Sequence, residues 1–230
     1  MNAGQVKAFF AQWEVYRQCI KQNTLHHREV WALLHATLEK HPPFRFLDIA
    51  CGDAAMTTAA LTGTAVTSYT GVDFSGPALD EARRMTQELP CPVEFHEIDY
   101  VDFVAGESEP FDVIYLGLSL HHLGRENKRR TLADIRRLTA AEGSFFLYEP
   151  ILLEGESRSG CLGRWQKQLE TVYRSFTPEA RESIWMHVRT ADHPEAISEY
   201  LGAAEAAGFS DGAVLFTDAA KLYSLFRFRP

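Results

Sequence analysis

Short apolar runs alternate with amphipathic stretches through the middle of the chain. The apolar runs predict β-strands near Arg45–Ile49, Thr67–Val72, Val93–Glu97, Val113–Leu116 and Gly143–Tyr148. The stretches with helical spacing predict α-helices near Ala54–Thr62, Gly76–Glu88 and Asn127–Thr139. Strands that alternate with helices in this way form a mostly parallel sheet with helices on both faces. The pattern therefore predicts a doubly wound, Rossmann-like α/β fold.

The segments on either side of this alternation carry different patterns. Apolar positions between Gln5 and Lys40 recur at helical spacing, which predicts two helices, with Asn23 or Thr24 as the N-cap of the second. After Pro150 the alternation stops, and two helical patterns follow around Leu162–Arg174 and Pro178–His187. The tail then predicts a helix over Pro194–Ala207 and strands over Ala213–Phe216 and Leu222–Phe228.

These elements predict a single domain, 1–230, built on a seven-stranded sheet. Residues 1–42 form an N-terminal helical cap, and residues 43–150 and 194–230 form the core. Residues 151–193 form a helical insertion, which we call the lid segment. Ligands of such sheets bind at the carboxyl ends of the strands, so the cap and the lid segment are expected to cover that edge.

Composition narrows the class of partner. The formal net charge of -8 disfavours binding to nucleic acid, because a phosphate backbone attracts cations. No window reaches the roughly 18 to 20 apolar residues of a membrane span, and no basic and apolar leader opens the sequence. The four cysteines are scattered without a Cys-x-x-Cys pair, which is typical of reduced thiols. We expect a cytoplasmic protein that binds neither membranes nor nucleic acid, and the oligomeric state is left open.

A ligand site is expected where the first strand ends. The segment Phe46–Met56 is an apolar run that closes in the acid Asp48, a turn of small residues, and the start of a helix. Backbone N–H groups at a helix start have no intrahelical partner, and small side chains let a ligand approach the main chain. About 20 residues after the Gly52 turn, Asp73 ends the second strand, where a carboxylate can accept both hydroxyls of a ribose.

Taken in order at successive strand ends, these motifs resemble the class I S-adenosylmethionine (SAM) dependent methyltransferases, in particular their small-molecule branch. The resemblance covers about residues 46–150 and rests on Asp48-Ile49-Ala50-Cys51-Gly52, Asp73, Asp99-Tyr100 and His121-His122-Leu123. It implies that the turn cradles the methionine part of SAM, that Asp73 holds the ribose and that Asp99 and Tyr100 flank the adenine. It also implies a closing antiparallel hairpin whose last strand slips between its neighbours. The expected cofactor contacts are Arg28, Asp48, Ala50, Cys51, Gly52, Asp73, Phe74, Asp99, Tyr100 and Leu116.

Several of these residues also have simpler explanations. Asp48 and Asp73 could serve only as a helix cap and a turn-former, and Asp99 could belong to a solvated loop. Arg28 could pair with the methionine carboxylate or make a surface ion pair. Many members of the family have Gly where this chain has Ala50 and Ala54, and alanine is tolerable there if its φ stays negative.

The acceptor is expected to lie under the cap and the lid segment, which are rich in aromatic side chains. For His121 a general base or substrate contact competes with a structural role, and no metal site is predicted, because adjacent histidines point in different directions. Lid arginines favour an anionic acceptor, whereas the rings and the negative net charge favour a cationic or aromatic heterocyclic one. With His121 as the first candidate for catalysis, the expected acceptor contacts are Tyr16, Tyr148, Glu149, Arg158, Trp165, Tyr173, Trp185 and His187.

The resemblance implies transfer of the SAM methyl group to a small molecule by in-line displacement, which leaves S-adenosylhomocysteine (SAH). The sulfonium is already activated, so the protein would contribute mainly alignment. A nicotinamide-dependent oxidoreductase is one alternative, although its usual Gly-x-Gly-x-x-Gly turn is missing here. A SAM-binding module without chemistry is the other.

Overall fold

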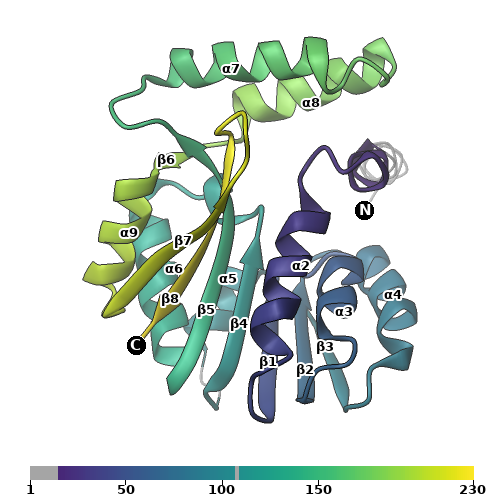
Figure 1. Cartoon of the computed structure of the whole chain (residues 1–230), viewed down its shortest axis with the longest axis vertical. Helices are drawn as coiled ribbons and strands as arrows, with labels where there is room; N and C mark the ends of the chain where they lie inside the picture. Colours follow the sequence, from purple (N-terminus) through teal and green to yellow (C-terminus); the bar gives the residue numbers. More distant parts are fainter. Residues whose placement is uncertain (1–14, 107–108) are drawn as a thin grey trace.

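The computed structural model describes residues 15–106 and 109–230. One sheet runs in the order β3-β2-β1-β4-β5-β8-β7, and a short β6 pairs with β5 off this path (Figure 1). All pairings are parallel except those of β8, which lies antiparallel between β5 and β7. The strands are β1 Phe44–Ile49, β2 Val66–Asp73, β3 Val93–Glu97, β4 Phe111–Gly117, β5 Thr139–Leu152, β6 Glu195–Ala196, β7 Asp211–Thr217 and β8 Tyr223–Arg229. The predicted doubly wound fold and its inserted last strand are confirmed, and the two-residue β6 adds an eighth strand to the seven predicted.

The helices follow the predicted order with shifted ends. Residues 15–22 are helical, and the apolar positions predicted before them lie outside the described residues. The other helices are α2 His27–Leu38, α3 Ala55–Leu61, α4 Gly76–Met85, α5 Tyr100–Ala105, α6 Arg125–Leu138, α7 Arg158–Thr171, α8 Pro178–Thr190 and α9 Ile197–Ala206, with two 3₁₀ turns, η1 Thr86–Glu88 and η2 Leu120–His122. The short α5 was not predicted. Within these helices no segment is long and apolar enough to span a membrane.

The start of α2 differs from the prediction. Its N-cap is His26, which has a left-handed backbone (φ 53°) and makes no side-chain cap. The side chain of Asn23 nevertheless accepts a hydrogen bond from the backbone N–H of Arg28 at 3.0 Å. Asn23 therefore satisfies a free N–H of the first helical turn from a position outside the helix.

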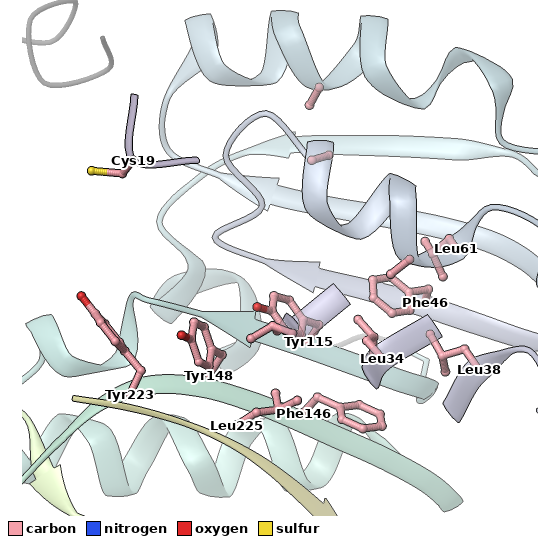
Figure 2. Close-up of a cluster of buried hydrophobic side chains, with 14 of the residues drawn as sticks. Cys19, Leu34, Leu38, Phe46, Leu61, Tyr115, Phe146, Tyr148, Tyr223 and Leu225 are labelled. Atoms are coloured by element: carbon pink, nitrogen blue, oxygen red, sulfur yellow. The ribbon is translucent and has the colours of Figure 1, made fainter. Parts of the chain in front are cut away.

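Alternate side chains of the central strands form two apolar layers, because successive residues of a strand point to opposite faces. Phe46, Tyr115, Phe146 and Tyr148 lie on the face covered by α2, where Figure 2 shows them with Leu34, Leu38 and other buried residues of the cluster. Their neighbours on the other face pack against α6 and α9 through Leu47, Ile114, Leu116, Leu132, Ile135 and Tyr200. Both faces of the sheet are thus buried, which fixes its carboxyl edge relative to the helices.

The lid segment lies beyond the carboxyl ends of β4 and β5, with α7 and α8 packed together (Figure 1). Trp165 of α7 meets the ring of Tyr223 at the start of β8, with centroids 5.8 Å apart. Arg164 pairs with Glu156 at 2.6 Å and donates to the carbonyl of Ile151 at 3.1 Å. These contacts fasten α7 to the end of the sheet.

Shortening Leu34, which is fully buried between α2 and the sheet, should test this packing. Leu34→Ala removes apolar area and leaves a cavity, so the free energy of unfolding should fall by about 2–5 kcal/mol. Denaturant unfolding measures the change. Lys40→Ala, at an 82% exposed side chain, is the matched control and should stay within about 0.5 kcal/mol of the parent. Equal effects of the two substitutions would contradict the packing described.

Candidate functional site

The turn after β1 has an unusual backbone. Ala50, Gly52 and Ala54 all have left-handed φ values, of 54°, 54° and 56°. The condition under which the two alanines would be tolerable, a negative φ, is therefore not met. These are positions at which many members of the resembled family have glycine, so the chain keeps the backbone shape while carrying a Cβ atom that this shape disfavours.

Asp73 at the end of β2 holds this turn. Its Oδ2 accepts the backbone N–H of Gly52 at 2.9 Å, and its Oδ1 accepts that of Ser75 at 2.8 Å. Burial raises the pKa of Asp73, and the backbone hydrogen bonds oppose that shift. A carboxylate oxygen can accept more than one hydrogen bond, so Asp73 can still receive hydroxyl donors from a ligand.

A cavity of about 380 Å³ opens beside the turn, and we call it the turn cavity. Asp48 is buried in its wall and accepts the hydroxyls of Tyr69 at 2.6 Å and Thr57 at 2.5 Å. Burial raises the pKa of Asp48 to about 7, although these two hydroxyl donors lower it. Other residues of the wall are Tyr16, His27, Arg28, Trp31, Ala50, Cys51, Asp53, Ala54, Tyr115, Gly117 and Leu118.

His27 is a member of this wall that sequence reasoning missed. It is buried, its Nδ1 has no hydrogen-bond partner among the described residues, and its Nε2 lies 3.4 Å from the hydroxyl of Tyr16. Burial lowers the pKa of His27 to about 4, so the ring is neutral near pH 7. The sequence offered no signal for it beyond a polar residue at the start of an amphipathic helix.

A second cavity, of about 300 Å³, lies under the lid segment, and we call it the lid cavity. Its wall is mostly apolar and aromatic, with a polar group of histidines and an aspartate. Tyr16 and Leu118 belong to the walls of both cavities, so the two adjoin. Other wall residues are Cys19, Leu25, His121, His122, Pro150, Trp165, Tyr173, Ile184, His187, Asp192 and Tyr223.

Glu149 of β5 organises the turn after β4. Its fully buried carboxylate accepts the backbone N–H groups of Ser119, Leu120 and His121, each at 2.9 Å. It also meets Nδ1 of the His121 ring at 2.6 Å. Burial lowers the pKa of His121, but the carboxylates of Glu149 and Asp192 outweigh it and raise that pKa to about 9.

Asp192, which follows α8 in the lid segment, contacts the histidines of the turn after β4. Its Oδ1 lies 3.5 Å from Nε2 of His121, 3.6 Å from Nδ1 of His122 and 3.2 Å from Nε2 of His187. Burial opposes the ionisation of Asp192, but His121 and His187 hold its pKa well below the usual range. Sequence reasoning missed Asp192, because nothing in its neighbourhood indicates a contact with residues 70 positions earlier.

Some of the residues predicted to bind the cofactor or the acceptor line the two cavities, and others do not. Arg28, Asp48, Ala50 and Cys51 line the turn cavity, and Tyr16, Trp165, Tyr173, His121 and His187 line the lid cavity. Three predicted cofactor contacts lie at or near the sheet edge: Phe74 is 73% exposed, Asp99 caps α5, and the Tyr100 hydroxyl donates to the carbonyl of Ser119 at 3.2 Å.

Five predicted contacts have other partners. The Leu116 side chain is buried in the layer with α6 and α9, on the opposite face from Tyr115 of the turn cavity. Glu149 is fully buried and holds the turn after β4. The Tyr148 hydroxyl donates to the carbonyl of Leu25 at 3.0 Å, and Arg158 donates to that of Val188 at 2.7 Å. Trp185 lines a separate surface hollow between α7 and α8.

Comparison with known proteins finds similarity to methyltransferases. The model of a methyltransferase domain matches residues 46–143, the stretch that holds the turn, Asp73, Asp99 and the His121–His122 pair. The matched stretch is less than half of the chain, and its similarity to a methyltransferase domain agrees with the resemblance to SAM-dependent methyltransferases. Among curated proteins none matches the sequence.

Solved methyltransferases share the domain's fold at low sequence identity. A putative O-methyltransferase from Nostoc punctiforme has a TM-score of 0.64 at 16% identity, over 88% of this chain and 56% of its own. A methyltransferase of calicheamicin biosynthesis in its SAH-bound form has a TM-score of 0.62 at 17% identity, over 98% and 60%. Human N-acetylserotonin methyltransferase in complex with SAM has a TM-score of 0.58 at 18% identity, over 87% and 52%. The chain thus spans little more than half the length of each.

Because Ala50 has a left-handed φ in the turn after β1, replacing it by glycine should be stabilising. Ala50→Gly relieves the contact between Cβ and the backbone at φ 54°, so the free energy of unfolding should rise by up to about 1 kcal/mol. Ala59→Gly, at an exposed helical position of α3, should instead lower it by about 1 kcal/mol. Denaturant unfolding of both variants gives the comparison. If both variants were less stable than the parent, Ala50 would not be strained by its left-handed backbone.

The raised pKa of Asp48 should couple cofactor binding to proton release. In the free protein the folded-state pKa, about 7, exceeds the ordinary value of 3.8, so stability should fall as pH rises between these two values and Asp48 ionises. The cationic cofactor favours the carboxylate form, so at about pH 6 its binding should release a proton, and at about pH 8.5 hardly any.

Calorimetry of SAM binding in two buffers of different ionisation enthalpy measures this proton release at each pH. Asp48→Asn cannot ionise, and it should abolish the difference between the buffers at the lower pH. The same release from parent and variant would show that another group loses the proton.

Proposed function

We propose that the protein transfers the methyl group of SAM to a small molecule bound in the lid cavity, leaving SAH. The observation that carries this proposal is that the turn cavity and the lid cavity adjoin at Tyr16 and Leu118. A cofactor in the first can then present its methyl group to an acceptor in the second. The neighbours of known structure support the fold, and the acceptor is inferred from this chain alone.

In this proposal the turn cavity receives the methionine part of the cofactor. Asp48 and Asp53 place negative charge in its wall, which suits the ammonium and sulfonium groups. Arg28 is an exposed residue at the same wall and is the candidate for the methionine carboxylate. The Arg28 side chain lies 3.4 Å from the carbonyl of Lys21, a long contact that a bidentate carboxylate would outcompete.

The adenosine part is assigned to the edge formed by β2 and β3. Asp73 would accept the ribose hydroxyls there. Phe74 and Ile98 are apolar side chains that are 73% and 39% exposed, and the backbone N–H of Ile98 donates to the carbonyl of Asp73 at 3.1 Å. Exposed apolar side chains beside a binding residue favour a flat ring between them, and Asp99 follows directly for the adenine amine.

The lid cavity favours an acceptor with an aromatic or apolar body. Trp165, Tyr173 and Tyr223 supply rings, and the polar side chains of the wall include the carboxylate of Asp192 beside three histidines. Arg158 points to a backbone carbonyl and Arg174 is exposed, and neither lines the cavity. No lid arginine that was predicted to favour an anionic acceptor therefore lines the cavity, and a neutral or cationic aromatic acceptor fits it better.

Catalysis would rest mainly on alignment. Holding the acceptor atom roughly 3 Å from the methyl carbon, in line with the sulfur, can contribute about 7–11 kcal/mol. Both ring nitrogens of His121 face carboxylates, and these raise its pKa to about 9, so near pH 7 the ring already holds its proton. His121, the predicted general base, can therefore accept an acceptor's proton only in its neutral form and with Nε2 free of Asp192 or any other partner.

The two alternative functions have less support. A nicotinamide-dependent oxidoreductase does not fit the match to a methyltransferase domain. A binding module without chemistry has no need of a second cavity walled by rings beside the first. A cytoplasmic location, consistent with four free cysteines, and the lack of nucleic-acid partners stay predictions.

Calorimetry with SAM, SAH and NADH tests the proposal, and Asp73→Asn locates the site. SAM and SAH should bind, and NADH should not. Loss of the Asp73 charge weakens two ribose hydrogen bonds, each worth about 1.5–3 kcal/mol when the acceptor is charged, so affinity should fall roughly 10- to 100-fold. Asp102→Asn, at an exposed acid of α5, is the matched control and should bind as the parent does.

Mass spectrometry then follows SAH production from SAM with a panel of aromatic amines, phenols and thiols. Turnover with at least one class, lost when Trp165→Ala alters the lid cavity, is the expected result. Binding of NADH in place of SAM would overturn the proposal. SAM binding without SAH production from any acceptor class would favour the binding module.

A further inference from the structure

Four metal-binding side chains converge at the wall of the lid cavity. They are His121 and His122 of η2, His187 of α8 and Asp192 just after α8, and their ligand atoms all lie within 4.8 Å of one another. The rings of His121 and His122 have centroids 4.0 Å apart, and those of His122 and His187 5.1 Å.

Hydrogen bonding does not account for this arrangement. Oδ1 of Asp192 is buried and faces three imidazole nitrogens at 3.2–3.6 Å, yet it has no aligned hydrogen-bond partner in the described parts of the chain. The imidazoles lie close enough to Oδ1 for ion pairs, but none donates an aligned hydrogen bond to it, so the oxygen keeps free lone pairs. A cation placed among the four atoms would bind them.

We propose that His121, His122, His187 and Asp192 bind a divalent transition-metal ion, with Zn²⁺ as the best fit. A tetrahedral zinc ion with bonds of about 2.0–2.1 Å holds its ligand atoms about 3.3–3.4 Å apart. The three distances from Asp192 Oδ1 span that value. Imidazole with one carboxylate suits zinc and its transition-metal neighbours, whereas Mg²⁺ and Ca²⁺ prefer oxygen ligands.

The partner of His121 supports the assignment. Nδ1 of its ring is held by Glu149 at 2.6 Å, which leaves Nε2 for the ion. Carboxylate–histidine pairs of this kind orient metal ligands in many zinc sites. Glu149 itself is fixed by three backbone N–H groups, so the ring has little freedom.

The two adjacent histidines reach the same point through different atoms. His121 faces the site with Nε2, the ring nitrogen farther from its backbone. His122 faces it with Nδ1, the ring nitrogen nearer to its backbone. The expectation that neighbouring histidines point apart overlooked this difference in reach. Nδ1 of His122 also lies 3.4 Å from the carbonyl of Ala191, a long contact that it would give up on binding the ion.

The ion would join two parts of the fold. His121 and His122 follow β4 of the core, whereas His187 and Asp192 belong to the lid segment. A site with four protein ligands is closed, which is typical of a structural role. We therefore assign the ion the task of fastening the lid segment over its cavity, a role that does not depend on methyl transfer.

Calorimetry on the full chain, freed of metal with a chelator and then titrated with Zn²⁺, tests the site. One ion per chain should bind, and thermal unfolding should shift to higher temperature as free Zn²⁺ rises above its dissociation constant. His187→Ala and Asp192→Ala each remove one ligand. Loss of a residue that only hydrogen-bonds a metal ligand typically lowers metal affinity roughly 10- to 100-fold. Loss of a ligand itself should lower the Zn²⁺ affinity by more than that.

His193→Ala is the matched control, because His193 is exposed, adjacent in sequence and outside the cluster, and it should bind Zn²⁺ as the parent does. A titration with Co²⁺ in place of Zn²⁺ adds a second measurement, the visible absorption of tetrahedral cobalt. A histidine that does not bind the metal would not affect this absorption. His187 is half exposed, so its variant should fold.

The proposal is overturned if no Zn²⁺ binds, if His187→Ala and Asp192→Ala bind as the parent does, or if the cobalt complex lacks the tetrahedral spectrum. Because the titrations contain no SAM and no acceptor, their outcome is separate from that of the methyl-transfer experiments.

Discussion

The carboxylate of Glu149 is the contact on which the functional edge of the sheet depends. A fully buried charge is tolerated only when donors surround it, and here three successive backbone N–H groups and one imidazole do so. Since Glu149 lies on a central strand, it fixes the turn after β4 to the core. That turn carries Leu118, which belongs to the walls of both cavities, and the paired histidines. Its left-handed Leu118, with φ 53°, is held in place by an N–H bond of 2.7 Å to the carbonyl of Tyr148.

Negative charge gathers along the same edge. Asp48, Asp53 and Asp73 surround the turn after β1, and Glu149 and Asp192 surround the turn after β4. Burial raises the pKa of all three acids of the first turn, which means that each would gain from a nearby cation. In the proposals above, a sulfonium cofactor would supply one such charge and a metal ion the other. Both turns would then use buried carboxylates to bind a cation.

The sequence predicted most of what local pattern determines. Apolar runs placed the strands, and the small-residue turn with its acid pointed to an edge of the sheet where the structure has a cavity, because each depends on residues close in the chain. Three features depend on contacts between distant residues and could not be predicted in this way. Asp192 meets His121 only because α8 folds back over the sheet, His27 enters the cavity wall only because α2 packs beside the turn, and Arg158 turns from the cavity to the end of α8. The left-handed alanines were missed for a different reason, since nothing in an alanine indicates a positive φ.

Tyr16 has a consequence for the order of events. Its ring is part of the wall of both cavities, and it belongs to a helical stretch outside the sheet. Moving that stretch aside would expose both chambers together. If methyl transfer takes place as proposed, departure of the methylated product and exchange of spent for fresh cofactor would share this one opening, so neither ligand would be trapped while the other leaves.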